Sequence, residues 1–133
     1  MTIDQISVFL ENRPGQLAEI TEELHEAKIN MMAINIAEAS EYGLIRLIVD
    51  DTDKALAVLK ENGFLVQCTK VTSVGVPDRP GALDAVTKVI SDAGINIEYM
   101  YSLLRERDGL AYMIFKTADP AALEKALASK GIF

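Results

Sequence analysis

The stretch NRPGQL at residues 12–17 decides the fold, because it recurs as DRPGAL at residues 78–83. The same offset of 66 residues places residues 29–30 on residues 95–96, and both pairs read Ile-Asn. Self-similarity at one fixed offset is typical of a structural unit that is used twice. We therefore divide the chain into a first repeat, residues 1–68, and a second repeat, residues 69–133.

The two repeats differ in charge although they share a pattern. Residues 1–66 hold five basic and twelve acidic side chains, whereas residues 67–133 hold eight of each. A common fold therefore does not require a common ligand in the two copies.

The composition of the 133-residue chain is that of a globular protein, with 50% hydrophobic residues, 25% charged residues and a net charge of -7. A nucleic-acid-binding protein needs a basic surface, so we expect no nucleic-acid partner. No apolar run approaches the ~18 residues that span a bilayer. Asp4 and Glu11 lie where a signal peptide would carry positive charge. We expect a cytoplasmic protein without a membrane partner.

The counts of reactive residues argue against metal and thiol chemistry. Cys68 is the only cysteine and His25 the only histidine, so the chain has neither an internal disulfide nor a Cys/His zinc set. We expect Cys68 to be a small core residue. The sequence around Asp50, Asp51 and Asp53 lacks EF-hand spacing and is typical of a capped helix start. We expect no metal, no cofactor and no catalytic residues.

The first repeat alternates between the periods of strands and helices. Ile6, Val8 and Leu10 recur at a spacing of two, which predicts a strand. A helix follows, with Pro14 in its first turn, Asn12 before it as a cap, and an apolar stripe. The stripe comprises Leu17, Ile20, Leu24 and Ala27. Strands at residues 30–38 and 44–49, joined by a turn at residues 41–43, a helix at residues 54–62 and a strand at residues 64–68 complete the unit.

The second repeat follows the same order but is shorter at its end. We expect a strand at residues 72–76, a helix after Pro80, a hairpin of residues 97–103 and 110–116 that turns at Asp108-Gly109, and a helix from Asp119. The order predicts an α+β protein of two ferredoxin-like βαββαβ repeats, of which the second lacks most of its last strand. Its sheet should therefore have an uncovered edge at residues 71–76, unless another segment or chain fills it.

The sequence resembles the ACT domain family of small regulatory modules. The resemblance is carried by residues 12–17 and 78–83, by Ile-Asn at residues 29–30 and 95–96, and by GINIEYMY at residues 94–101, which is similar to stand-alone tandem ACT proteins. It implies a non-catalytic protein that binds an amino acid, with the ligand at an interface between two domains.

The loop between the first strand and the first helix of each repeat could hold an α-amino acid. Free amides at a helix start attract a carboxylate, Gly15 lets a ligand approach the backbone, and Asn12 or Asp78 could meet the ligand's ammonium group. Asn30 and Asn96 at the next strand could add a polar contact. The candidate binding residues are Asn12, Gly15, Gln16, Leu17, Asn30 and Met31, and in the second repeat Asp78, Gly81, Ala82, Leu83, Asn96 and Ile97.

Two alternatives stay open at this point. Arg-Pro-Gly could serve only the turn and the helix start, and Asn30 and Asn96 could hydrogen-bond only the turn that leaves the helix. The main hypothesis is an amino-acid sensor that forms a homodimer and regulates a partner protein. The second hypothesis is an interaction module that dimerises without a ligand.

Overall fold

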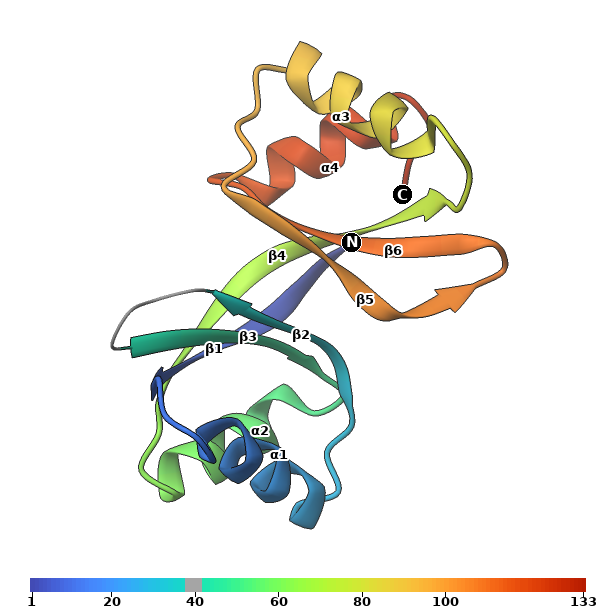
Figure 1. The fold of residues 1–133 in the computed structure, drawn as a ribbon. Coiled ribbons are helices and arrows are strands. Elements are labelled where there is room, and N and C mark those ends of the chain that lie inside the picture. The colour runs from blue at the N-terminus through green and yellow to red at the C-terminus, as the bar shows by residue number, and fades with distance from the viewer. Residues whose placement is uncertain (38–41) are drawn as a thin grey trace. The chain divides into compact units, whose positions relative to one another are not determined.

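Each repeat folds as an antiparallel sheet that carries two helices on one face (Figure 1). The computed structural model describes residues 1–37 and 42–133, with the exception of the Arg105 side chain. Along the chain the elements are β1 (Thr2–Glu11), α1 (Gln16–Glu26), β2 (Met31–Ala37), β3 (Tyr42–Val49), α2 (Thr52–Glu61), β4 (Leu65–Pro77), α3 (Ala82–Asp92), β5 (Tyr99–Arg107), β6 (Leu110–Lys116) and α4 (Pro120–Ala128). The predicted fold class, two ferredoxin-like repeats, is confirmed.

The chain divides into two units that follow the repeats closely. The first-repeat unit is Asp4–Thr69, and the second-repeat unit is Met1–Ile3 together with Lys70–Phe133. The predicted division after residue 68 differs from this by residues 1–3 and Thr69.

The first-repeat unit has the strand order β2-β3-β1-β4, with α1 and α2 over one face. The alternating side chains of β1 point under the helices, and Ile6, Val8, Ile20 and Leu24 are fully buried there. The register pairs Glu11 with Tyr42, so the loop that leaves β1 lies beside the start of β3. This end of the sheet is where α1 begins.

The second-repeat unit has the order β5-β6-β4, and the start of β1 lies on the other side of β4. The Ser73 N–H donates a hydrogen bond to the Met1 carbonyl (2.8 Å), and the Gly75 N–H donates one to the Phe133 carbonyl (2.9 Å). The second repeat does lack its own last strand, as predicted. However, its edge at residues 71–76 is covered, because residues 1–3 and the last residue of the chain supply backbone partners for it.

Both first helices begin later than the sequence suggests. The N-cap residues are Gly15 and Gly81, with φ of 90° and 87°, and the helices start at Gln16 and Ala82. Pro14 and Pro80 therefore belong to the preceding turn, and neither Asn12 nor Asp78 is the capping residue. The left-handed conformation at the cap is one that glycine adopts without strain.

The later start shifts the buried stripe of each helix. Gln16 and Ala82 are buried, whereas Leu17 and Leu83 are 37% and 38% exposed. The prediction that Leu17 packs into the core is therefore wrong. The polar side chain of Gln16 takes the inner position because it finds hydrogen-bond partners there, as described below.

The predicted caps of α2 and α4 are confirmed, whereas the predicted bounds of β4 and β5 need correction. Asp51 and Asp119 cap α2 and α4 as predicted, by accepting hydrogen bonds from Lys54 N–H and Ala122 N–H. The expected strands at residues 64–68 and 72–76 form one continuous strand, β4. β5 begins at residue 99 instead of 97, although the Glu98 N–H already donates a hydrogen bond to the Lys116 carbonyl of β6 (2.9 Å).

Two further predictions concern single positions. Asp108 and Gly109 form the expected two-residue turn, both with positive φ, as a type I′ hairpin requires. Cys68 is exposed rather than buried. The predicted turn at residues 41–43 and the end of the strand at residue 38 fall partly outside the described residues.

Candidate functional site

The loop of the first repeat presents the start of α1. The Glu19 N–H closes the first helical turn on the Gly15 carbonyl at 3.0 Å, and the Gln16 N–H bonds the Arg13 carbonyl at 3.4 Å. The Gln16 amide is thus engaged within the loop, which corrects the expectation that it is free. The N–H groups of Leu17 and Ala18 come before Glu19, the first residue whose N–H bonds within the helix. Such N–H groups at a helix start are available to an acceptor from outside the helix.

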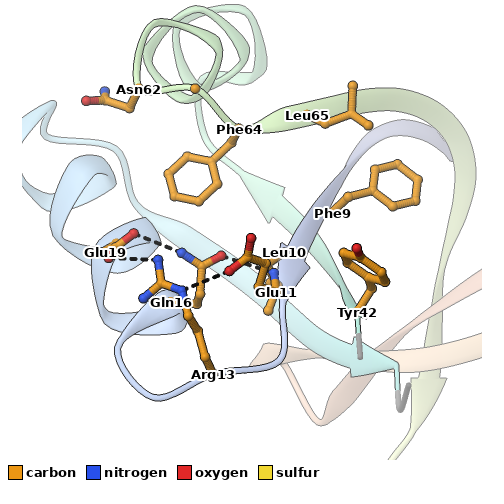
Figure 2. A pocket seen from close by; sticks show the side chains of 11 residues that line it. Phe9, Leu10, Glu11, Arg13, Gln16, Glu19, Tyr42, Asn62, Phe64 and Leu65 are labelled. Carbon is orange, nitrogen blue, oxygen red and sulfur yellow. Dashed lines mark hydrogen bonds and ion pairs between the residues drawn. The ribbon is translucent and has the colours of Figure 1, made fainter. Parts of the chain in front are cut away.

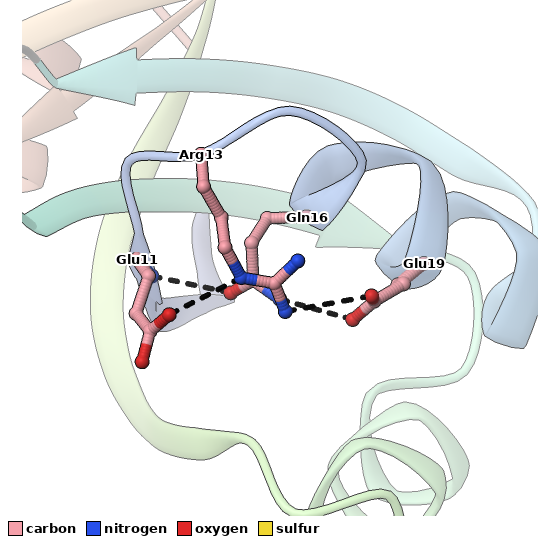
Figure 3. Close-up of polar contacts among 4 residues, drawn as sticks. All are labelled: Glu11, Arg13, Gln16 and Glu19. Carbon is pink, nitrogen blue, oxygen red and sulfur yellow. Dashed lines mark hydrogen bonds and ion pairs between the residues drawn. The ribbon is translucent and has the colours of Figure 1, made fainter.

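Four side chains hold this loop in place, and we call Glu11, Arg13, Gln16 and Glu19 the loop network (Figure 3). The Gln16 Oε1 accepts a hydrogen bond from the Glu11 N–H (3.1 Å), and its Nε2 donates one to the Glu19 Oε2 (2.9 Å). The Arg13 guanidinium lies between the two carboxylates, 3.1 Å from Glu11 Oε2 and 3.5 Å from Glu19 Oε1. The network joins the end of β1 to the first turn of α1.

A pocket of about 340 Å³ lies against this loop, and we call it the loop pocket. Its polar wall is made of Asn12, Arg13 and Gln16. The apolar wall comes from β1, α1, β2 and β3 and consists of Leu10, Leu17, Ile36, Ala37, Gly43 and Ile45. A volume of this size is within the range of small-molecule sites in proteins.

A second pocket, of about 560 Å³, lies on the other side of the loop network, and we call it the aromatic pocket (Figure 2). Phe9 and Tyr42 line one side of it and the loop network lines the other, with Phe64 near the start of β4. Leu10, Arg13 and Gln16 line both pockets. Two members of the loop network, Arg13 and Gln16, therefore belong to the wall that the two pockets share.

The structure brings together only part of the predicted first-repeat site. Asn12, Gln16 and Leu17 line the loop pocket, and Gly15 lies between them in the chain. Asn30 and Met31 lie at the far end of α1, because eleven helical residues span about 16 Å. There the Asn30 N–H donates a hydrogen bond to Asp50 Oδ1 at 3.0 Å, and the Asn30 carbonyl accepts one from the Asp50 N–H at 3.1 Å.

The predicted second-repeat residues separate in the same way. Asp78 lies beside the Asp108 turn, since its N–H donates to the Gly109 carbonyl at 3.1 Å, and Gly81, Ala82 and Leu83 follow at the start of α3. Asn96 lies at the other end of the unit, in a pocket of about 580 Å³ with Glu98 and Asp119. Ile97 lines a neighbouring pocket that also includes Asn96.

Neither a metal centre nor a membrane-spanning helix is found among the described residues. Within residues 1–37 and 42–133, no group of three His, Cys, Asp or Glu side chains is arranged so that it could bind a metal ion. In the same ranges, no helix combines the length and the apolar character that crossing a membrane requires.

The repeat, the fold of each unit and the glycine-capped loops agree with a comparison to known families. A family model for an ACT domain pair matches residues 1–130. The chain belongs to the ACT domain pair family. The resemblance inferred from the Arg-Pro-Gly loops is thereby confirmed.

Solved structures have a similar fold. Protein BT0572 from Bacteroides thetaiotaomicron is 39% identical, with a TM-score of 0.93 over 99% of this chain and 90% of that one. The regulatory subunit of aspartate kinase from Thermus thermophilus, in a ligand-free form, is 19% identical, with a TM-score of 0.67 over 98% and 97%. The corresponding subunit from Thermus flavus is 17% identical, with a TM-score of 0.61 over 97% and 94%. A comparison with curated proteins found no match.

Sequence reasoning missed the side chains that organise the ACT loop. It placed Gln16 among the candidate binding residues without a role for its side chain, and it did not include Glu19. One signal was present, because Gln16 and Glu19 are one helical turn apart and become Ala82 and Ala85 in the second repeat. A polar pair that only one of two equivalent loops carries indicates a local structural role for that pair.

Proposed function

We propose that this ACT domain pair is a non-catalytic regulatory protein that binds an amino acid in the loop pocket of its first repeat. The observation that carries the proposal is the loop pocket itself, in which a helix start, a polar wall and an apolar wall meet within about 340 Å³. An α-amino acid has an anionic, a cationic and a variable part, and each has a suitable wall there.

The polar parts of the ligand would bind at the loop. The amides of Leu17 and Ala18 at the start of α1 suit the carboxylate, because a helix N-terminus carries partial positive charge. The side-chain oxygen of Asn12 suits the ammonium group as an acceptor. Gly15 has no atom within 4 Å of the place where a Cβ would stand, so the backbone there is open to a ligand.

The regulatory part of the proposal rests on the family. The Thermus structures that share this fold are regulatory subunits of aspartate kinase. By analogy, a bound ligand would change the affinity of this protein for a partner protein or for a second copy of itself. The homodimer, the regulated partner and the cytoplasmic location stay predictions.

A ligand screen tests the proposal directly. The purified protein is heated with each of the twenty amino acids, and binding of each hit is then measured by titration calorimetry. A ligand at ~100 times its Kd should stabilise the protein by about 2.7 kcal/mol. Light scattering with and without the hit tests the homodimer.

Two matched variants locate the binding site. Asn12→Ala should weaken binding by about tenfold or more, because it removes the proposed partner of the ammonium group. Asp78→Ala changes the equivalent position of the second repeat and should leave the affinity unchanged. Loss of binding only in Asp78→Ala would move the site to the second repeat. A protein that dimerises and responds to no amino acid would support the interaction module instead.

A further inference from the structure

The side chains around the loop pocket differ in kind between its two walls. Leu10, Ile36, Ala37 and Ile45 supply aliphatic surface from three adjacent strands, and Leu17 adds to it from α1. Among the described residues of the lining, none is aromatic and none carries a carboxylate. On these residues, the part of a ligand that faces the strands meets aliphatic carbon and the backbone of Gly43.

Arg13, the charged group among the described residues of the lining, is already paired. Its guanidinium contacts the carboxylates of Glu11 and Glu19 at 3.1 and 3.5 Å. The Gln16 amide is likewise occupied, by the Glu11 N–H and the Glu19 carboxylate. A charged side chain on the ligand would lose its hydration against the apolar wall, and these two polar side chains are already engaged with other partners.

Resting on the proposed amino-acid site, we propose that the loop pocket selects neutral α-amino acids with aliphatic side chains over those with charged side chains. The apolar wall is built on the sheet and adjoins the buried core through Ile45, so it is a fixed surface. Each methylene that the wall covers should raise the affinity, by a factor of about 10 or more for a well-packed group.

A graded ligand series measures this selectivity. Calorimetry with alanine, 2-aminobutyrate, valine and isoleucine should show affinity that rises by about tenfold with each added carbon until the pocket is full. Lysine, arginine, aspartate and glutamate should bind at least 100-fold more weakly than the tightest of these ligands.

A variant of the wall supplies the second readout. Ile36 is 54% exposed at the rim of the pocket, so Ile36→Glu should leave the fold intact. It places a carboxylate on the wall, and we expect at least tenfold weaker binding of valine and isoleucine and a relative gain for lysine. Leu104→Glu is the matched control, because Leu104 is an exposed aliphatic residue, 71% accessible, on β5 of the second repeat. It should leave all affinities unchanged.

The outcomes separate this inference from the proposed function. If no amino acid binds, the proposed function fails, and the selectivity fails with it. If amino acids bind and Asn12→Ala weakens them, but charged ones bind as tightly as valine, only the selectivity is overturned. If Ile36→Glu and Leu104→Glu change the ligand affinities equally, the aliphatic wall is not part of the binding site.

Discussion

The two Arg-Pro-Gly loops have nearly the same backbone. Gly15 and Gly81 have φ of 90° and 87°, and the amides after them make the same bonds. Arg13 and Arg79 each donate their N–H to the carbonyl two residues before, at 2.9 Å in both loops. The first hydrogen bond of each helix is also the same, because the Gly15 carbonyl accepts from the Glu19 N–H and the Gly81 carbonyl from the Ala85 N–H, each at 3.0 Å. The shared sequence is therefore sufficient to build the turn.

The side chains around the two loops differ. Only the first loop has the loop network, since Gln16 and Glu19 correspond to Ala82 and Ala85. The position of Glu11 is taken by Pro77, which has no N–H and so has no bond to offer a residue at position 82. The comparison teaches that Arg-Pro-Gly explains the turn, whereas the surrounding side chains make the first loop a candidate binding site.

The largest expected effect comes from the glycines. Gly15→Val and Gly81→Val should each destabilise the protein by about 1–3 kcal/mol, because a β-branched residue is strained at these φ values. No neighbouring atom lies within 4 Å of either new Cβ, so the cost is one of backbone strain. Denaturant unfolding measures it. Only Gly15→Val should also abolish amino-acid binding, and loss in both variants would contradict a site in one repeat.

Removing Gln16 should make the first loop resemble the second. Gln16→Ala deletes both side-chain hydrogen bonds of a buried residue and should lower the free energy of unfolding by about 1–2 kcal/mol. The reverse change, Ala82→Gln, should stabilise nothing, because Pro77 cannot donate to the new side chain. Thermal unfolding of both variants checks this. A stabilising Ala82→Gln would show that the network does not depend on the β1 N–H.

The arginines should show a smaller difference. Arg13 is about half exposed and pairs with two carboxylates, so Arg13→Ala should cost about 0.2–1 kcal/mol, less at high salt. In the part of the chain that the structure describes, no ion pair joins Arg79 to a carboxylate, and Arg79→Ala should be neutral. Unfolding at low and at high salt measures the contrast. Equal, salt-independent effects would mean that the ion pairs contribute nothing.

The smallest expected effect concerns how the second-repeat unit covers its edge. The Thr2 hydroxyl donates a hydrogen bond to the Glu124 carboxylate at 2.7 Å, which lowers the pKa of Glu124 below its ordinary value of 4.5. A lowered pKa means that this contact stabilises the folded state fully above pH 4.5 and less as the pH falls through the folded-state pKa. Faster exchange of the Ser73 amide below pH 4.5 would report the loss.

A control variant isolates that contribution. Glu124→Gln removes the titrating group, so the pH dependence of Ser73 exchange should flatten relative to the Val8 amide in the first-repeat unit. An unchanged pH profile in Glu124→Gln would assign the effect to other carboxyl groups.

Much of the fold could be predicted because it depends on local patterns. The spacing of Ile6, Val8 and Leu10 indicated β1, and Asp51 and Asp119 indicated the starts of α2 and α4. At Leu17 the prediction failed because it misplaced the start of the helix. Leu17 was expected in the core by its period, but the glycine cap begins the helix at residue 16 and turns Gln16 inward instead.

Part of the candidate site could be predicted for the same reason. Asn12, Gly15, Gln16 and Leu17 are neighbours in the chain, so a motif places them together. Asn30 follows the helix in sequence, but the length of α1 carries it to the far end of the sheet. Ile36 and Ile45 join the pocket through strand pairing, which no local pattern reveals.

The sequence by itself determined the duplication, the order of the elements, the two Arg-Pro-Gly turns and the family, since each depends on residue types at short or repeated spacings. Only the tertiary structure decided which side chains surround each turn and what covers β4 in the second repeat. Residues 1–3 lie about 70 positions from Ser73 in the chain, and only folding brings their hydrogen-bonding groups together. The backbone donors of a buried strand need partners, and the fold takes them from wherever the chain can supply them.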